Sequence, residues 1–163
     1  MKSIMRIILL FTFSLALLFQ TGCNTESDRP ADMPRLYPVT ITVTGDGQPR
    51  EEILVNLIAK TPAKYGAASG TTDASGDAKI LTYGFVGVPL GEYTVTLSRI
   101  DIEGMTRVEN SGGWDEFGGQ VYQYVEDKYT KAESTPYSIT VTEKGVKETF
   151  EIGAPVRTFV RNN

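Results

Sequence analysis

Between residues 37 and 152 the sequence consists of short segments in which apolar and polar side chains alternate. In the segment 37–44, bulky apolar residues occupy every second position and threonines fill most positions between them. The segments 90–98 and 137–142 repeat this pattern. Successive side chains of a strand point to opposite faces, so a period of two residues is typical of a half-buried β-strand. The segment 53–59 is apolar except at Asn56, which predicts a central strand.

These segments recur at intervals of about ten residues, and no amphipathic helix long enough for a crossover separates them. The spacing therefore predicts an all-β fold, an antiparallel β-sandwich of about seven strands over residues 37–153. A loop is expected at 61–70, where glycine and alanine are frequent. Five glycines interrupt the alternation at about 100–124, which predicts a long insertion or a poorly ordered hairpin there. A hairpin at 137–152 is expected to close the domain, followed by a C-terminal tail at 154–163.

The first 22 residues have the pattern of an export signal. Lys2 and Arg6 precede an apolar run from Ile7 to Phe19, and a cationic start followed by such a run is typical of a secretory signal peptide. A helix over this run would span roughly 20 Å, less than the roughly 30 Å of bilayer hydrocarbon. A permanent transmembrane helix is therefore the less favoured alternative.

Cys23 is the single cysteine of the chain, and it follows Thr21 and Gly22 soon after the apolar run. The segment from Gln20 to Cys23 resembles the lipobox of bacterial lipoproteins, although Gln20 stands where that family prefers an aliphatic residue. The resemblance implies cleavage before Cys23, lipidation of its sulfur and anchoring in the bacterial cell envelope. Asn24, rather than aspartate, favours the outer membrane, or the outer face of the plasma membrane in a cell with one membrane. The alternative is an ordinary signal peptide with an incidental cysteine, which a lone thiol in an exported protein argues against.

Residues 23–36 predict a flexible tether between this cysteine and the first strand. The segment is rich in proline and small polar residues and shows no periodicity, a composition typical of an extended linker.

The residue inventory excludes several kinds of chemistry. The chain has no histidine, and the lack of histidine and of a second cysteine excludes Ser-His-Asp and Cys-His nucleophile systems and zinc sites built from these residues. It carries 16 Lys+Arg against 20 Asp+Glu, so a nucleic-acid partner is not expected. We therefore expect no catalytic residues and no cofactor. A carboxylate-dependent hydrolase acting on an envelope polymer or polysaccharide is the alternative.

Four segments carry a resemblance to a known domain family: 45–49 (GDGQP), 53–55 (ILV), 70–77 (GTTDASGD) and 89–95 (PLGEYTV). Together they resemble the carboxypeptidase regulatory-like domain, a transthyretin-like β-sandwich of bacterial envelope proteins. The resemblance covers about residues 39–152 apart from the insertion, and it departs at Ile53, where the family usually has alanine. It implies a Greek-key-type sandwich that serves as an accessory binding, scaffold or spacer module.

Three residues within these segments are predicted to shape turns. Gly76 is expected to supply a positive φ, and Asp73 to accept backbone N–H groups in an Asx-turn. Gly91 is expected to let the chain turn into the strand that contains Tyr93. A calcium site at Asp73 and Asp77 is the less favoured alternative, because no glutamate completes a twelve-residue calcium loop. We therefore expect no metal.

The candidate ligand contacts are four aromatic residues in or beside the insertion: Trp114, Phe117, Tyr122 and Tyr124. Aromatic rings on a loop of a β-sandwich can bind sugar rings or another protein through their large apolar area. This interpretation predicts an envelope polysaccharide or protein as a partner, besides the membrane itself. The alternative is that these rings cover the sandwich as a lid.

The two interpretations of Trp114 differ in a measurable way. If the ring is an exposed binding anchor, Trp114→Ala will leave the melting temperature nearly unchanged and weaken a partner. If it is a lid, the same change will lower the free energy of unfolding by roughly 3 kcal/mol. Trp114 is the single tryptophan, so its fluorescence reports on this site alone. A blue-shifted emission protected from quenchers in the free protein would contradict the binding interpretation.

Overall fold

The computed structural model describes residues 29–109 and 115–160, and it leaves out the side chains of 105–118. The chain divides into two compact units, Met1–Asp32 and Met33–Asn163, and every strand of the described residues belongs to the second. This unit begins before the boundary expected at residue 37, and Met33 is buried. Cys23 and Trp114 lie outside the described residues.

The second unit has an all-β fold, with thirteen strands and one short helix in its described part. In chain order the elements are β1 (Val39–Gly45), β2 (Gln48–Pro49), β3 (Leu54–Ala59), β4 (Ala67–Thr71), β5 (Asp77–Lys79), β6 (Leu81–Thr82), β7 (Phe85–Val86), β8 (Gly91–Ser98), β9 (Ile100–Glu109), β10 (Asp115–Gln123), α2 (Asp127–Thr130), β11 (Ser138–Val141), β12 (Val146–Glu151) and β13 (Thr158–Phe159). Over 29–109 and 115–160, no helix has the length and apolar character needed to cross a bilayer.

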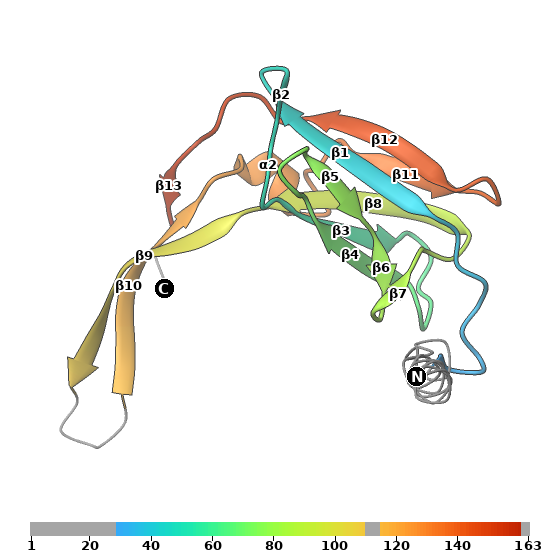
Figure 1. The fold of residues 1–163 in the computed structure, drawn as a ribbon, viewed down its shortest axis with the longest axis horizontal. Helices are drawn as coiled ribbons and strands as arrows, with labels where there is room; N and C mark the ends of the chain where they lie inside the picture. The colour runs from blue at the N-terminus through green and yellow to red at the C-terminus, as the bar shows by residue number, and fades with distance from the viewer. Residues whose placement is uncertain (1–28, 110–114, 161–163) are drawn as a thin grey trace, which may run out of the picture. The chain divides into compact units, whose positions relative to one another are not determined.

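Two sheets share one hydrophobic core (Figure 1). The smaller sheet has the order β12-β1-β2, with β5 also paired to β1, and the larger sheet has the order β11-β8-β3-β4-β6-β7. Both contribute fully buried side chains, including Ile41 from β1, Leu57 from β3 and Leu97 from β8. In β1 the apolar residues are buried and the threonines between them are partly exposed. Its alternation therefore arises from burial of one face.

The expectation of a central strand at 53–59 is confirmed, because β3 lies between β8 and β4. The loop expected at 61–70 is wrong over its second half, where β4 lies. A Cβ atom on Gly70 would come within 2.4 Å of the Lys79 carbonyl oxygen. The small residues of this segment thus fit a strand that closely approaches a neighbouring backbone, as well as a loop.

The prediction of a hairpin at 137–152 is also wrong. β11 pairs antiparallel with β8 in the larger sheet, whereas β12 runs parallel to β1 in the smaller one. The turn between them passes the chain from one sheet to the other, with Gly145 at φ 77°. Alternation fixes which face of a strand is buried but not which strand it pairs with. Two strands on opposite sheets bury their apolar faces in one core as well as two strands of a hairpin do.

Adjacent positions of β8 offer a direct test of this arrangement. Val95 is 0% exposed in the core, while Thr94 is partly exposed on the opposite face. We expect Val95→Asp to lower the free energy of unfolding by about 3–5 kcal/mol, because it buries an unpaired charge. Thr94→Asp should cost less than about 1 kcal/mol. Denaturant unfolding of both variants measures the difference, and equal losses would contradict the assignment of faces.

Candidate binding surface

The expected insertion is an antiparallel hairpin of β9 and β10, and β13 pairs with the other edge of β10 (Figure 1). These three strands form a sheet of their own. The register places Asp101 opposite Tyr122 and Glu103 opposite Gln120, while Tyr122 also lies opposite Phe159. Because directly opposed residues share a face, the side chains of Asp101, Glu103, Tyr122 and Phe159 lie on one face of this sheet. We call this the charged face.

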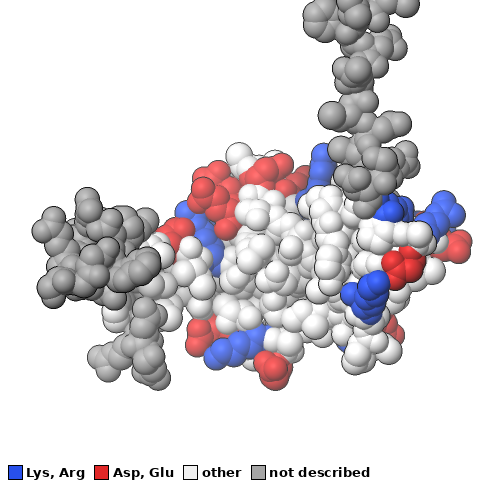
Figure 2. Space-filling model, turned by 90° about the horizontal axis from the view of Figure 1, so that it is seen from below, with Lys and Arg blue, Asp and Glu red and all other residues white. Residues whose placement is uncertain are grey.

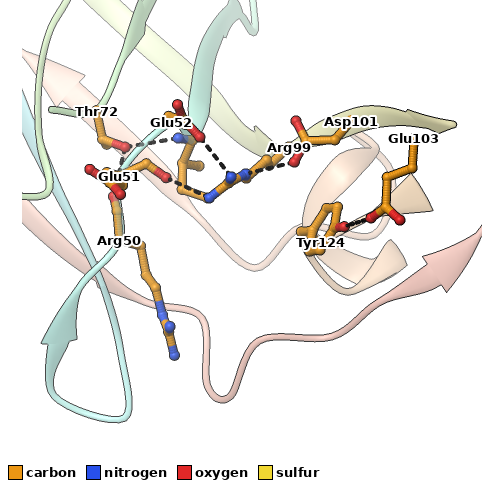
Figure 3. A network of polar contacts seen from close by, with 9 residues as sticks. Arg50, Glu51, Glu52, Thr72, Arg99, Asp101, Glu103 and Tyr124 are labelled. Carbon is orange, nitrogen blue, oxygen red and sulfur yellow. Dashed lines mark hydrogen bonds and ion pairs between the residues drawn. The ribbon is translucent and has the colours of Figure 1, made fainter. Parts of the chain in front are cut away.

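Arg99 joins the base of the hairpin to the segment that precedes β3. Its guanidinium lies 2.6 Å from the Glu52 carboxylate and 3.3 Å from that of Asp101, and it donates to the Glu51 carbonyl oxygen at 3.4 Å (Figure 3). It also lies 5.4 Å from the centre of the Tyr124 ring. Arg99 therefore connects the base of the three-stranded sheet to the segment before β3 through two carboxylates and one backbone carbonyl.

Arg157 forms a second connection on the charged face. Two of its nitrogens donate to the two carboxylate oxygens of Glu103, at 2.6 and 3.3 Å. The Tyr124 hydroxyl donates to the same carboxylate (Figure 3). Hydrogen bonds from Arg157 and then from Tyr124 lower the pKa of Glu103, and the bond to Glu103 raises the pKa of Tyr124. Glu103 is therefore held as a carboxylate.

The structure brings two of the four candidate aromatic contacts together. Tyr122 and Tyr124 both lie on the charged face: the Arg157 guanidinium lies 3.6 Å from the centre of the Tyr122 ring, and the Tyr122 hydroxyl donates to Gln120 at 2.5 Å. The backbone of Phe117 lies in β10 opposite Arg107, and its side chain, like all of Trp114, is outside the described part of the chain. Both tyrosines thus have partners within the chain. The roles of all four as ligand contacts stay predictions.

Two of the predicted turn residues, Asp73 and Gly76, lie in the turn before β5, whereas Gly91 is the first residue of β8. Asp73 Oδ1 accepts hydrogen bonds from Ser75 N at 2.9 Å, Ser75 Oγ at 2.6 Å and Asp77 N at 3.2 Å. These bonds, the Ser75 hydroxyl first, lower the pKa of Asp73. Gly76 has a φ of 80° and Gly91 a φ of 151°. The Asp73 carboxylate is occupied by its own turn.

No metal cluster is found in the part of the chain that the structure describes, where no three histidine, cysteine, aspartate or glutamate side chains converge. Thr42 donates to Asp77 Oδ1 at 2.5 Å. The two aspartates considered for calcium therefore both have hydrogen-bond partners within the chain.

Two depressions lie on the β unit. One, of about 410 Å³, lies over β3, β4, β6 and β8 and includes Asn56, Ser69 and Thr96 in its lining. The other, of about 320 Å³, lies beside the start of β8 and is lined by Tyr65 and Tyr93 among others. The alternation in the sequence did not indicate either, because each depends on which strands are neighbours.

Comparisons with known proteins reveal little similarity. No protein-family model matches the chain, and no curated protein matches it. One solved structure, a 9R-lipoxygenase from Cyanothece PCC8801, is 16% identical over 78% of this chain and 18% of the lipoxygenase chain, with a TM-score of 0.29. A likeness this low carries no argument about fold or activity.

The Arg157–Glu103 contact predicts a pH-dependent attachment of β13. The pKa of Glu103 is lower in the folded protein than in the unfolded chain. The contact of Glu103 with Arg157 therefore stabilises the fold fully above the unfolded-state pKa, and this stabilisation is lost as the pH falls through the folded-state pKa. We expect Arg157→Gln to raise the pKa of Glu103 toward its ordinary value, as measured by NMR of the carboxyl carbon. On acidification, the Val160 amide, which donates to Val121 O at 2.8 Å, should lose exchange protection in the unmodified protein.

Arg157→Lys is the matched control, because lysine keeps the charge but cannot form the two-pronged contact. It should give a pKa of Glu103 between those of the unmodified protein and Arg157→Gln. An unchanged pKa in Arg157→Gln would contradict the assigned contact.

Proposed function

We propose that the chain is a non-catalytic lipoprotein of the bacterial cell envelope, with residues 1–22 as its signal peptide. The observation that carries the proposal is the position of the single cysteine. Cys23 directly follows Gly22, soon after the apolar run, and residues 24–32 separate it from the compact unit that begins at Met33. In this proposal, a lipid on Cys23 anchors the chain and the β unit is a binding, scaffold or spacer module.

The lipid would supply the membrane affinity. The chain has a formal net charge of −4, which does not favour binding to an anionic bilayer. One acyl chain binds only marginally, whereas two or three, at about 0.8 kcal/mol per buried CH₂, hold a protein firmly. The acidic net charge is therefore compatible with anchoring through a lipid on Cys23.

We further propose that the β unit is a Greek-key-type sandwich of the transthyretin-like, carboxypeptidase regulatory-like class. Three of the segments that carry the resemblance correspond to two turns and to the start of a strand. Segment 45–49 contains the turn between β1 and β2, with Asp46 and Gly47 at positive φ, and 70–77 contains the Asp73 turn. Segment 89–95 leads into β8. These positions, and the core shared by two sheets, support the assignment.

A non-catalytic role is supported by the contacts of three carboxylates, those of Asp101 and Glu103 on the charged face and that of Glu52 before β3. A glycoside hydrolase needs one carboxylic acid whose raised pKa keeps it protonated. Glu103 has a lowered pKa, set first by Arg157, and Glu52 and Asp101 both contact Arg99. No observation favours the alternative of a carboxylate-dependent hydrolase.

Metabolic labelling tests the anchor. Cells that express the full chain with a labelled fatty acid should give a labelled protein in the membrane fraction. Cys23→Ser should abolish the label and release the protein from membranes, because its hydroxyl cannot replace the thiol that receives the lipid. Gln20→Leu, which restores the residue type the lipobox prefers, is the matched control and should keep or increase the label. A Cys23→Ser variant that is still labelled would overturn the proposal.

A further inference from the structure

The larger sheet carries a depression on its outer face, the side turned away from the core. Its volume is about 410 Å³, within the range of roughly 300–1,000 Å³ that ligand sites occupy. None of its nine lining residues is charged. Figure 2 views the molecule from below and shows a broad area without charged side chains. In Figure 1, β3 and β4 lie on this lower side. The depression is therefore suited to an uncharged ligand.

The strand register sets polar groups in a row across this depression. Thr96 on β8 lies opposite Asn56 on β3, Asn56 lies opposite Ser69 on β4, and Ser69 lies opposite Leu81 on β6. Neighbouring strands are about 4.8 Å apart, similar to the repeat of one sugar ring along an extended glycan. A hydroxyl, an amide and a second hydroxyl thus follow one another at that spacing.

These polar groups have no hydrogen-bond partner within the described part of the chain. Thr96 is 5% exposed, but its hydroxyl oxygen is not a buried atom without a partner, because Arg50 Nε is the side-chain atom of that kind found in the described residues. The other two buried threonines differ, because the Thr72 hydroxyl donates to Arg50 O at 2.6 Å and that of Thr82 to Gly87 O at 2.8 Å. With no bond inside the described residues, the Thr96 hydroxyl is open to the depression, where water or a ligand can hydrogen-bond it.

Tyr83 lies at the rim of the depression in an unfavourable backbone conformation. It and Gly84 form the two-residue turn between β6 and β7, with φ angles of 52° and 87°. Such turns favour asparagine, aspartate or glycine, and a bulky residue at positive φ is strained. Tyr83 is 66% exposed, and its ring contacts that of Tyr65 edge-on, with the ring centres 5.6 Å apart. Strain of this kind is typical of functional positions.

We propose that this depression binds a neutral saccharide. Thr96, Asn56 and Ser69 hydrogen-bond its hydroxyl groups, while Tyr83 and Ile58 contact the apolar face of a sugar ring. The acidic balance of the chain disfavours an anionic glycan. The inference rests on the proposed function as a binding module, and it names the site and ligand class of that module.

NMR titration of the full-length protein tests the inference. The ¹⁵N-labelled chain is held in a zwitterionic detergent, because a sugar headgroup would compete for the site. The probes are three neutral trisaccharides, cellotriose, maltotriose and tri-N-acetylchitotriose, with trigalacturonate as the anionic control. At least one neutral probe should shift the side-chain amide of Asn56 and the backbone amides of Ser69 and Thr96, and trigalacturonate should not.

Substitutions then test whether the row of Thr96, Asn56 and Ser69 binds the saccharide. Thr96→Val removes the hydroxyl with little change in shape and should weaken binding about five- to tenfold. Thr40→Val is the matched control: Thr40 is partly exposed on β1 of the smaller sheet, and its replacement should leave the affinity unchanged. Tyr83→Asn should weaken binding without lowering the melting temperature, because asparagine suits the turn.

Three results would overturn the inference: no shift with any neutral probe at about 10 mM, shifts confined to Tyr122 and Phe159 on the three-stranded sheet, or equal affinities of Thr96→Val and Thr40→Val. The lipid label on Cys23 is measured separately. Sugar binding without the label overturns only the anchor, and the label without sugar binding overturns only this inference.

Discussion

The burial of one face of each of two sheets in a common core is the constraint on which the other features depend. Ile41, Leu57 and Val95 are completely excluded from solvent, and a one-residue slip of any of their strands would turn such side chains outward. The core therefore fixes the register of β1, β3 and β8. The same register fixes the outer faces, so the row formed by Thr96 and Asn56 is a consequence of the packing behind it.

The three-stranded sheet is held in a different way. Its connections to the rest of the unit include the contacts of Arg99 with Glu52 and the Glu51 carbonyl, and Arg157 links the C-terminal segment to Glu103. Exposed ion pairs contribute only about 0–1 kcal/mol each. Segments held by few buried contacts open locally at lower free energy than the core. We therefore expect salt and pH to act on this sheet before they affect the two-sheet core.

The alternation in the sequence predicted the features that depend on neighbouring residues. It located β1, β3, β8 and β11, because a period of two is visible within one strand. It misassigned the partner of β12 and overlooked β4, because pairing and close approach depend on distant segments. At the candidate site it indicated Tyr122 and Tyr124 but not Arg157, which is 54 residues from its partner Glu103. Likewise, the row across β8, β3 and β4 exists only through the pairing of three strands.

The parallel pairing of β1 with β12 has a mechanical consequence for a chain held at its N-terminal end. The pairing extends from Val39↔Val146 to Thr44↔Glu151, and β1 is the first strand after the segment that leads from Met33. A tension applied there along β1 would load these inter-strand hydrogen bonds together in shear, because they run across the strands. Bonds loaded together resist extension better than bonds opened one at a time, so the first strand is suited to transmit pulling force into the folded unit.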